Sequence, residues 1–173
     1  MESLVENTLK IAGVVKESIV DGPGIRYTVF TQGCPHHCKG CHNPQTHDFN
    51  GGKLVSIDKI IQDIQKDPLL SGVTISGGEP FMQANQVANL IDKLDRKKLN
   101  VMIYSGFCYE DLLKKANEEN GFLKLLQKVD VLIDGKFELE QKSEKLPFRG
   151  SLNQRSIDVK KSLATGNTVL YEF

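Results

Sequence analysis

Residues 72–104 read GVTISGGEPFMQANQVANLIDKLDRKKLNVMIY, and this stretch decides the fold. Its two ends, Gly72–Ser76 and Asn100–Tyr104, are short runs rich in β-branched and apolar residues, a pattern typical of buried strands. Between them, over about Gln83–Lys97, apolar side chains recur at helical spacing, namely Val87, Leu90, Ile91 and Leu94. A strand, a helix and a second strand in this order predict a βα unit with parallel strands.

The same alternation extends in both directions along the chain. Upstream we expect an extended stretch Lys10–Val20, a strand Arg26–Thr31, and a helix Ile57–Lys66 with Ser56 as its N-cap. Downstream we expect a helical region Glu110–Lys128 broken at Asn120-Gly121, a strand Asp130–Ile133, a charged loop Phe137–Lys145, and two short strands at Ser156–Val159 and Thr168–Tyr171. The whole pattern predicts an α/β fold with a mainly parallel sheet.

Composition narrows the class of protein. The chain has 173 residues, 22 basic and 22 acidic side chains, and 39% hydrophobic residues, which suits one domain with an ordinary core. The zero net charge excludes a broad nucleic-acid or acidic-membrane surface. No apolar run approaches the roughly 20 residues of a membrane span, and Met1–Lys10 lacks the basic-then-apolar pattern of a signal peptide. We therefore expect a cytoplasmic protein.

The four cysteines carry the chemical information. Three of them, Cys34, Cys38 and Cys41, lie close together, whereas Cys108 is isolated. In a reducing compartment such a cluster indicates metal binding or catalysis rather than disulfides. The spacing of four and three is also that of one helical face. Pro35 and Gly40, together with the polar residues between the cysteines, disfavour that alternative.

Two metal centres fit these thiols. A structural zinc would take the three thiolates and one of His36, His37 or His42. Zinc sites usually combine two short ligand motifs, however, and the chain has no second one. A four-iron, four-sulfur cluster normally takes one thiolate per iron, so three cysteines leave one iron open to a small molecule. We favour the cluster and keep zinc as the alternative.

The C-x3-C-x2-C spacing resembles the radical S-adenosylmethionine enzymes, a resemblance that implies that the cofactor's methionyl group chelates the open iron. That superfamily usually has an aromatic residue before the third cysteine. This chain has Gly40 there, which suits a close approach of the backbone to the cofactor. His42 and Asn43, which follow Cys41, are candidates for the cofactor pocket.

Two further segments resemble cofactor-binding motifs of the same superfamily. Ser76-Gly77-Gly78-Glu79-Pro80 resembles the GGE motif, which implies that Gly77, Gly78 and Glu79 receive the cofactor's amino group. Asp134-Gly135-Lys136 resembles an Asp-x-Lys pair that contacts the cofactor. Read without the resemblance, the first segment is a common turn and the second is a solvated strand end.

Asp21-Gly22-Pro23-Gly24-Ile25-Arg26 and the tail block FRGSLNQR (148–155) complete the resemblance, which is to the activating proteins of anaerobic ribonucleoside-triphosphate reductase. It implies a partial βα barrel of radical S-adenosylmethionine type over residues 1–173. It also implies a [4Fe-4S] cluster reduced by flavodoxin or ferredoxin, cleavage of S-adenosylmethionine, and a 5′-deoxyadenosyl radical that generates a glycyl radical on the reductase. The alternatives are an activase of another glycyl-radical enzyme, such as a formate-lyase type, and a zinc-binding interaction module.

The sequence also predicts where these residues meet and which others take no part. The cysteine loop, Gly77-Gly78, Ser105-Gly106 and Asp134-Gly135 each follow a strand, so we expect them at one edge of the sheet. No acid–base or nucleophilic constellation is needed beyond the cluster and cofactor. We expect Cys108, Tyr104 and Phe107 to be packing residues, and His36 and His37 to lie on the surface.

Overall fold

The strand–helix–strand unit expected over residues 72–104 is present in the computed structural model, which describes residues 7–173. β4 (Gly72–Gly77) and β5 (Asn100–Tyr104) pair in parallel, joined by the short 3-10 helix η2 (Pro80–Gln83) and α2 (Ala84–Asp92). α2 ends before the predicted boundary because Asp95 opens a turn. Its side chain accepts a hydrogen bond from the Lys97 amide at 3.2 Å.

Within residues 7–173, seven strands form one sheet in the order β3-β1-β2-β4-β5-β6-β7. The remaining strands are β1 (Thr8–Ser18), β2 (Arg26–Thr31), β3 (Lys53–Ser56), β6 (Val131–Asp134) and β7 (Arg155–Asp158). β2, β4, β5 and β6 run parallel at the centre. β1 pairs antiparallel with β2 and β3, and β7 pairs antiparallel with β6. The α/β class is confirmed, with a mixed sheet that stays open.

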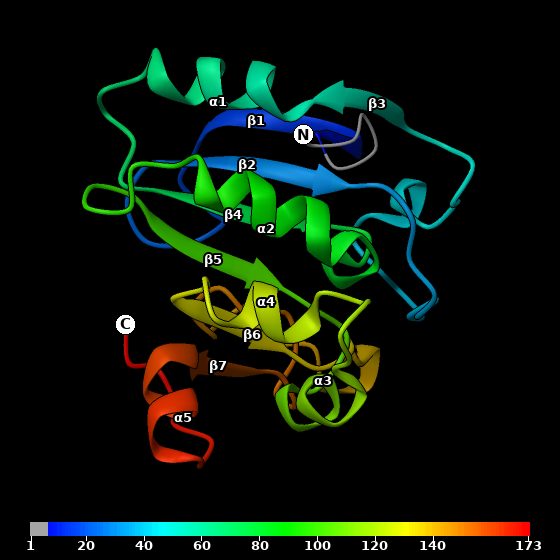
Figure 1. Cartoon of the computed structure of the whole chain (residues 1–173). Helices are drawn as coiled ribbons and strands as arrows, with labels where there is room; N and C mark the ends of the chain where they lie inside the picture. Colours follow the sequence, from blue (N-terminus) through cyan, green and yellow to red (C-terminus); the bar gives the residue numbers. More distant parts are fainter. Residues whose placement is uncertain (1–6) are drawn as a thin grey trace.

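The helices that follow the strands cover one face of this sheet. They are α1 (Ile57–Gln65), α3 (Tyr109–Lys115), α4 (Phe122–Leu126) and α5 (Val159–Thr165). Two further 3-10 helices, η1 (Pro44–Thr46) and η3 (Leu139–Gln141), lie in loops. Figure 1 shows α1, α2 and α4 side by side in front of the strands. Val29, Ile75 and Ile103 point toward these helices and are fully buried in the main core.

The opposite face of the sheet is more polar and lies beneath the segment 137–154. Arg26, Thr74 and Met102 are buried on this face. Phe148 packs against the small apolar cluster that contains Met102, and its carbonyl accepts a hydrogen bond from the Tyr104 hydroxyl at 2.6 Å. The two faces of the sheet therefore differ: one carries the core, and the other is partly open and bears polar groups.

The structure differs from the predictions in four local features. β3 was not expected, since it is a short, exposed edge strand without hydrophobic alternation. Ser56 occupies the N-cap position of α1, but its side chain makes no capping hydrogen bond. The segment after β7 is the helix α5, capped by Asp158, whose side chain accepts a hydrogen bond from the Lys161 amide at 3.0 Å. The expected last strand is reduced to an isolated bridge between Ile157 and Leu170.

The expectation about the first ten residues falls partly outside the described part of the chain, since residues 1–6 are not described. Among residues 7–173, no helix is long and apolar enough to cross a membrane.

Candidate metal centre

The turns that follow the parallel strands meet at one edge of the sheet, as predicted. The cysteine loop follows β2, Gly77-Gly78 ends β4, Ser105-Gly106 follows β5, and Gly135 follows β6. Residues from all of these turns line one cavity of about 140 Å³. The carboxyl ends of parallel strands are where α/β folds place their sites, and the cysteines lie at that position here.

Cys34, Cys38 and Cys41 all line this cavity. Cys34 is buried, with 7% of its surface exposed, and the other two thiols are half-buried. Burial raises the pKa of the Cys34 thiol, and the neighbouring Glu79, Cys38 and Cys41 add to the rise. Burial likewise raises the pKa of the Cys38 thiol. The three sulfurs are therefore near enough to influence one another electrostatically.

Backbone hydrogen bonds fold the cysteine loop back on itself. The Gly33 amide donates to the Thr46 carbonyl at 2.7 Å, and the Cys34 amide donates to the His47 carbonyl at 3.1 Å. At the other end of the loop, the Asn43 amide donates to the Cys41 sulfur at 3.4 Å. The segment is a loop and not a helix, so the alternative of a buried helical stripe is wrong.

The two metal centres make different demands on the thiols. Bonds of about 2.3 Å in a tetrahedral zinc site bring its sulfurs to about 3.8 Å from one another. Among residues 7–173, no three cysteine, histidine or carboxylate side chains converge closely enough to hold one metal ion. A four-iron cluster is a larger body with one thiolate on each of its irons, so it accepts sulfurs that line a cavity without meeting at a point. Three thiols that line one cavity are compatible with a four-iron cluster.

Gly77 and Gly78 form a cavity wall that packs against the start of the cysteine loop. The Gly78 amide donates to the Thr31 carbonyl at 2.8 Å, and the Glu79 amide donates to the Gly33 carbonyl at 2.9 Å. A Cβ on Gly78 would lie 2.5 Å from the Gly33 oxygen. The resemblance to the GGE motif implied that these glycines receive the cofactor. Their close contacts with the protein's own backbone already require glycine at both positions.

Several other predicted cofactor residues can now be placed. His42, Asn43, Gly77 and Gly78 line the cavity, whereas Gly40, Glu79, Asp134 and Lys136 are not among its lining residues. Gly40 has a left-handed φ of 74°, and a Cβ there would meet Leu139 at 3.0 Å. Its freedom therefore serves a turn packed on Leu139 rather than a wall of the cavity. Lys136 is exposed, and its charge acts on the Cys38 thiol in the direction of a lower pKa.

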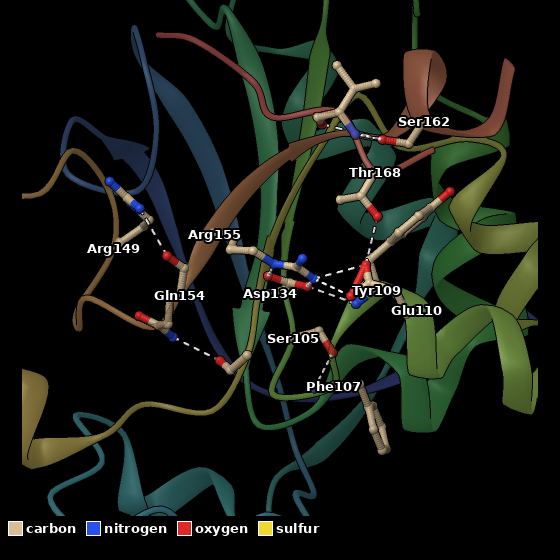
Figure 2. A network of polar contacts seen from close by, with 12 residues as sticks. Ser105, Phe107, Tyr109, Glu110, Asp134, Arg149, Gln154, Arg155, Ser162 and Thr168 are labelled. Carbon is tan, nitrogen blue, oxygen red and sulfur yellow. Dashed lines mark hydrogen bonds and ion pairs between the residues drawn. The ribbon is translucent and has the colours of Figure 1, made fainter. Parts of the chain in front are cut away.

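Asp134 is engaged within the protein, as Figure 2 shows. Its carboxylate, 1% exposed, accepts hydrogen bonds from Arg155 at 2.5 and 3.0 Å and from the Tyr109 amide at 2.8 Å. Arg155 also reaches Glu110 at 2.8 Å, and Glu110 accepts from the Thr168 hydroxyl at 2.8 Å. These contacts raise the pKa of the Arg155 guanidinium and tie β6, β7 and α3 together.

The histidine and Cys108 predictions need correction. His36 does not lie on the surface: its side chain is 6% exposed and its Nε2 lies 2.6 Å from Glu79 Oε1. His37 is exposed, as expected. Cys108 is exposed rather than buried, and it lies outside the residues that line the cavity. Tyr104 also lines the cavity, in addition to its packing role.

The sequence indicated the remaining residues of the cavity lining to different degrees. Ser76, Ser105, Gly106 and Gly135 each adjoin the end of a strand, which is a sufficient signal for this edge of the sheet. Gln154 belongs to the tail block, where its side chain donates to the Gly135 carbonyl at 3.0 Å. Nothing in the sequence pointed to His47 or Phe137.

A larger cavity of about 780 Å³ adjoins the first one. The two share His42, Asn43, Ser76, Tyr104, Phe137 and Gln154 as lining residues. The larger cavity extends across the polar face of the sheet between the β1–β2 turn, at Val20 and Asp21, and the segment 142–150. Its volume falls within the range of about 300–1,000 Å³ that is usual for small-molecule sites.

Comparison with known proteins agrees with this centre. Residues 20–157 match the family described as a 4Fe-4S single cluster domain. An anaerobic ribonucleoside-triphosphate reductase-activating protein of Vibrio cholerae is 36% identical over 145 residues, which cover 79% of this chain and 89% of that relative. The proteins of the same name from Haemophilus influenzae and from enterobacteria phage T4 are 36% identical over 146 residues and 32% identical over 142 residues. These matches cover 79% of this chain in both cases, and 89% and 85% of the relatives.

The matched region contains the cysteine loop and the turns that surround the cavity, so the similarity includes the candidate site as well as the sheet. The chain carries a 4Fe-4S single cluster domain and belongs to the family of anaerobic ribonucleoside-triphosphate reductase-activating proteins.

Proposed function

We propose that this chain activates anaerobic ribonucleoside-triphosphate reductase as a radical S-adenosylmethionine enzyme, with a [4Fe-4S] cluster on Cys34, Cys38 and Cys41. When bound, the reduced cluster supplies an electron that splits S-adenosylmethionine into methionine and a 5′-deoxyadenosyl radical, which removes a hydrogen atom from a glycine α-carbon of the reductase. In this proposal the chain, residues 1–173, is one domain, and its open sheet is the partial barrel of that superfamily.

One observation carries the proposal: three thiols, and no fourth, line the cavity at the carboxyl edge of the parallel strands. Among residues 7–173, the lining contains Cys34, Cys38 and Cys41, whereas Cys108 is exposed elsewhere. A cluster that serves only electron transfer is normally held by four thiolates. Three thiolates leave a coordination position for a ligand, as a catalytic zinc site also does.

The residues around the thiols have distinct tasks in this proposal. The Asn43 amide donates to the Cys41 sulfur, and hydrogen bonds to sulfur tune the reduction potential of such a centre. Gly77 and Gly78 offer backbone polar groups at the cavity wall, where the amino group of the cofactor would bind. His42 and Asn43 line both cavities and would contact the cofactor.

Four other residues that the motifs suggested as cofactor contacts have indirect roles in this proposal: Glu79, Asp134, Lys136 and Gly40. Their side chains or Cβ positions face other parts of the protein or solvent, so any contact with the cofactor would be indirect. We assign Asp134 and Gly40 to holding the surrounding turns. Lys136 would act through its positive charge near Cys38.

The larger cavity fits the second part of the reaction. It adjoins the cavity that the thiols line, and its rim includes the exposed apolar side chains of Val15 and Val20. A glycine-containing segment of the reductase would enter from this rim, and the cavity walls would keep water away from the radical. The proposal further places the protein in the cytoplasm, with flavodoxin or ferredoxin as the electron donor.

The experiment that tests this function is anaerobic incubation with the glycyl-radical subunit of the reductase, S-adenosylmethionine and a low-potential reductant. We expect a glycyl radical signal in the electron paramagnetic resonance (EPR) spectrum, with methionine and 5′-deoxyadenosine as products. The Cys38→Ala variant should give none of these. Methionine formation without a signal on the reductase, but with one on a formate-lyase type enzyme, would assign the chain to another partner.

A further inference from the structure

A buried carboxylate lies behind the cavity at the point where three turns meet. Glu79 has no exposed surface, and both of its oxygens accept hydrogen bonds. Oε1 accepts from the Gly106 amide at 2.8 Å and lies 2.6 Å from His36 Nε2, while Oε2 accepts from the Phe81 amide at 3.0 Å. The Ser105 hydroxyl donates within reach of both oxygens, at 2.9 and 3.0 Å.

These donors come from different parts of the fold. His36 belongs to the cysteine loop after β2, Glu79 and Phe81 follow β4, and Ser105 and Gly106 follow β5. A buried carboxylate is costly unless donors surround it, and donors satisfied in this way hold their own segments in place. Glu79 therefore connects the cysteine loop to the turns after β4 and β5 through its hydrogen bonds.

His36 connects the Glu79 carboxylate to the loop that carries the thiols. It lies midway between Cys34 and Cys38 in the sequence. Its ring packs edge-on against Phe107, with the ring centroids 4.6 Å apart. The Gly106 backbone packs closely against the same ring, because a Cβ on Gly106 would lie 2.4 Å from it. The imidazole is thus held by a hydrogen bond, by a ring contact and by the backbone of the turn after β5.

We propose that Glu79 and His36 are positioning residues: the carboxylate holds the His36 imidazole and thereby fixes the backbone between Cys34 and Cys38 in the conformation that binds the cluster. The inference rests on the proposed function, because it takes these thiols as cluster ligands. It gives Glu79 a different role from the one that its motif suggested, since the carboxylate acts behind the thiols and does not touch the cofactor.

The two amide substitutions of His36 separate this role from general packing. The amide nitrogen of glutamine reaches about as far as Nε2 of histidine, whereas the asparagine amide reaches only as far as Nδ1. His36→Gln therefore keeps a donor for Glu79, and His36→Asn removes it. The matched control is His37→Asn, since His37 is the adjacent, exposed histidine and asparagine tolerates its left-handed φ of 49°.

Iron binding provides a readout that does not depend on activity. The full chain is reconstituted anaerobically with iron and sulfide, and its affinity for iron is measured by competition with a chelator. We expect about 10–100-fold weaker binding for His36→Asn, because loss of an outer hydrogen bond at a metal site typically has that effect. His36→Gln and His37→Asn should bind iron like the unchanged protein. The EPR spectrum of reduced His36→Asn should also be broadened relative to His36→Gln.

Wild-type affinity and an unchanged spectrum in His36→Asn would overturn the inference. Equal losses in His36→Asn and His36→Gln would also overturn it, since the ring contact with Phe107 would then be what matters. If His36→Asn does not fold, as judged by circular dichroism of the metal-free protein, Ser105→Ala removes a donor to the same carboxylate. We expect weaker iron binding there as well, and an unchanged affinity would contradict the inference. An unchanged protein that binds no iron would instead refute the proposed function.

Discussion

Two buried charged side chains join the same three strands, one at each end. Arg26 lies where β2, β4 and β5 begin, and Glu79 lies where the turns after these strands meet. Arg26 is 1% exposed, and its guanidinium donates to the Thr74 hydroxyl at 2.8 Å and to the Asn100 side chain at 2.9 Å. It also donates to the carbonyls of Pro23, Val73 and Asn100, each at 3.1 Å.

The difference lies in where the partners come from. Most partners of Arg26 are strand atoms, and this side chain lies away from the thiols. Burial lowers the pKa of its guanidinium to about 10. Most partners of Glu79 are loop residues that line the cysteine cavity, namely His36, Ser105 and Gly106. A buried charge with several hydrogen-bond partners therefore stabilises the sheet at one end and shapes a site at the other. Variants at the two ends should separate stability from cluster binding.

The largest effect is expected for the thiols at the carboxyl end. Replacing Cys34, Cys38 or Cys41 by alanine should abolish cleavage of S-adenosylmethionine, because the cluster loses an iron ligand. Cys108→Ala is the matched control, since this thiol is exposed and is not among the residues that line the cavity. Anaerobic iron analysis and methionine release measure both effects. A colourless Cys108→Ala protein would show that the division of the cysteines into three and one is wrong.

At the amino end, Arg26→Met should destabilise the fold by about 3 kcal/mol, because several buried acceptors lose their donor. Denaturant unfolding of the metal-free protein measures this free energy. Below its unfolding transition, the variant should still bind iron in the wild-type amount. Loss of iron binding in a folded Arg26→Met protein would mean that the two ends of the sheet are not separable.

A smaller effect is expected where the β4 turn packs on the cysteine loop. Gly78→Ala should cost about 2 kcal/mol, because its Cβ would overlap the Gly33 carbonyl at 2.5 Å. Gly13→Ala in β1 is the control, with nothing within 4 Å of the added Cβ. Its stability should be unchanged or slightly higher. Equal stabilities of the two variants would refute the close packing of this turn.

The smallest effect concerns a partly buried contact on the helix-covered face of β2. The Tyr27 hydroxyl donates to Asp63 at 2.8 Å and holds the pKa of that carboxyl below its usual value. This stabilisation is present above the unfolded-state pKa of about 3.9 and is lost as the pH falls through the lower folded-state pKa. Tyr27→Phe should therefore lower stability at pH 7 by less than about 1 kcal/mol, with a smaller difference near pH 2. A pH-independent difference would contradict this assignment.

The parts of the fold that the sequence predicted are those with local signals. β4, α2 and β5 follow from hydrophobic periodicity within one short stretch, and the cysteine spacing identified its loop directly. The convergence of the turns followed from the rule that parallel strands share an edge. By contrast, β3 is short, largely solvent-accessible and without hydrophobic alternation, so its pairing with β1 depends on tertiary contacts that carry no periodic signal.

The side-chain contacts that the sequence did not reveal join distant parts of the chain. His36 and Glu79 are 43 positions apart, and Asp134 and Arg155 are 21 apart. The second pair is a cross-strand pair of β6 and β7, and its partners become evident only once that antiparallel register is known. A motif names the residues that a family uses, but only the fold shows which of them point away from the cavity.

The central claim is that three thiols hold a four-iron cluster with one open position. The most direct test is anaerobic iron and sulfide analysis of the purified chain, followed by EPR of the reduced protein with and without S-adenosylmethionine. We predict four irons and four sulfides per chain, as the matched 4Fe-4S family implies, and a signal that changes when the cofactor is added. A protein with one zinc and no sulfide, or a cluster whose signal is unchanged by the cofactor, would contradict the claim.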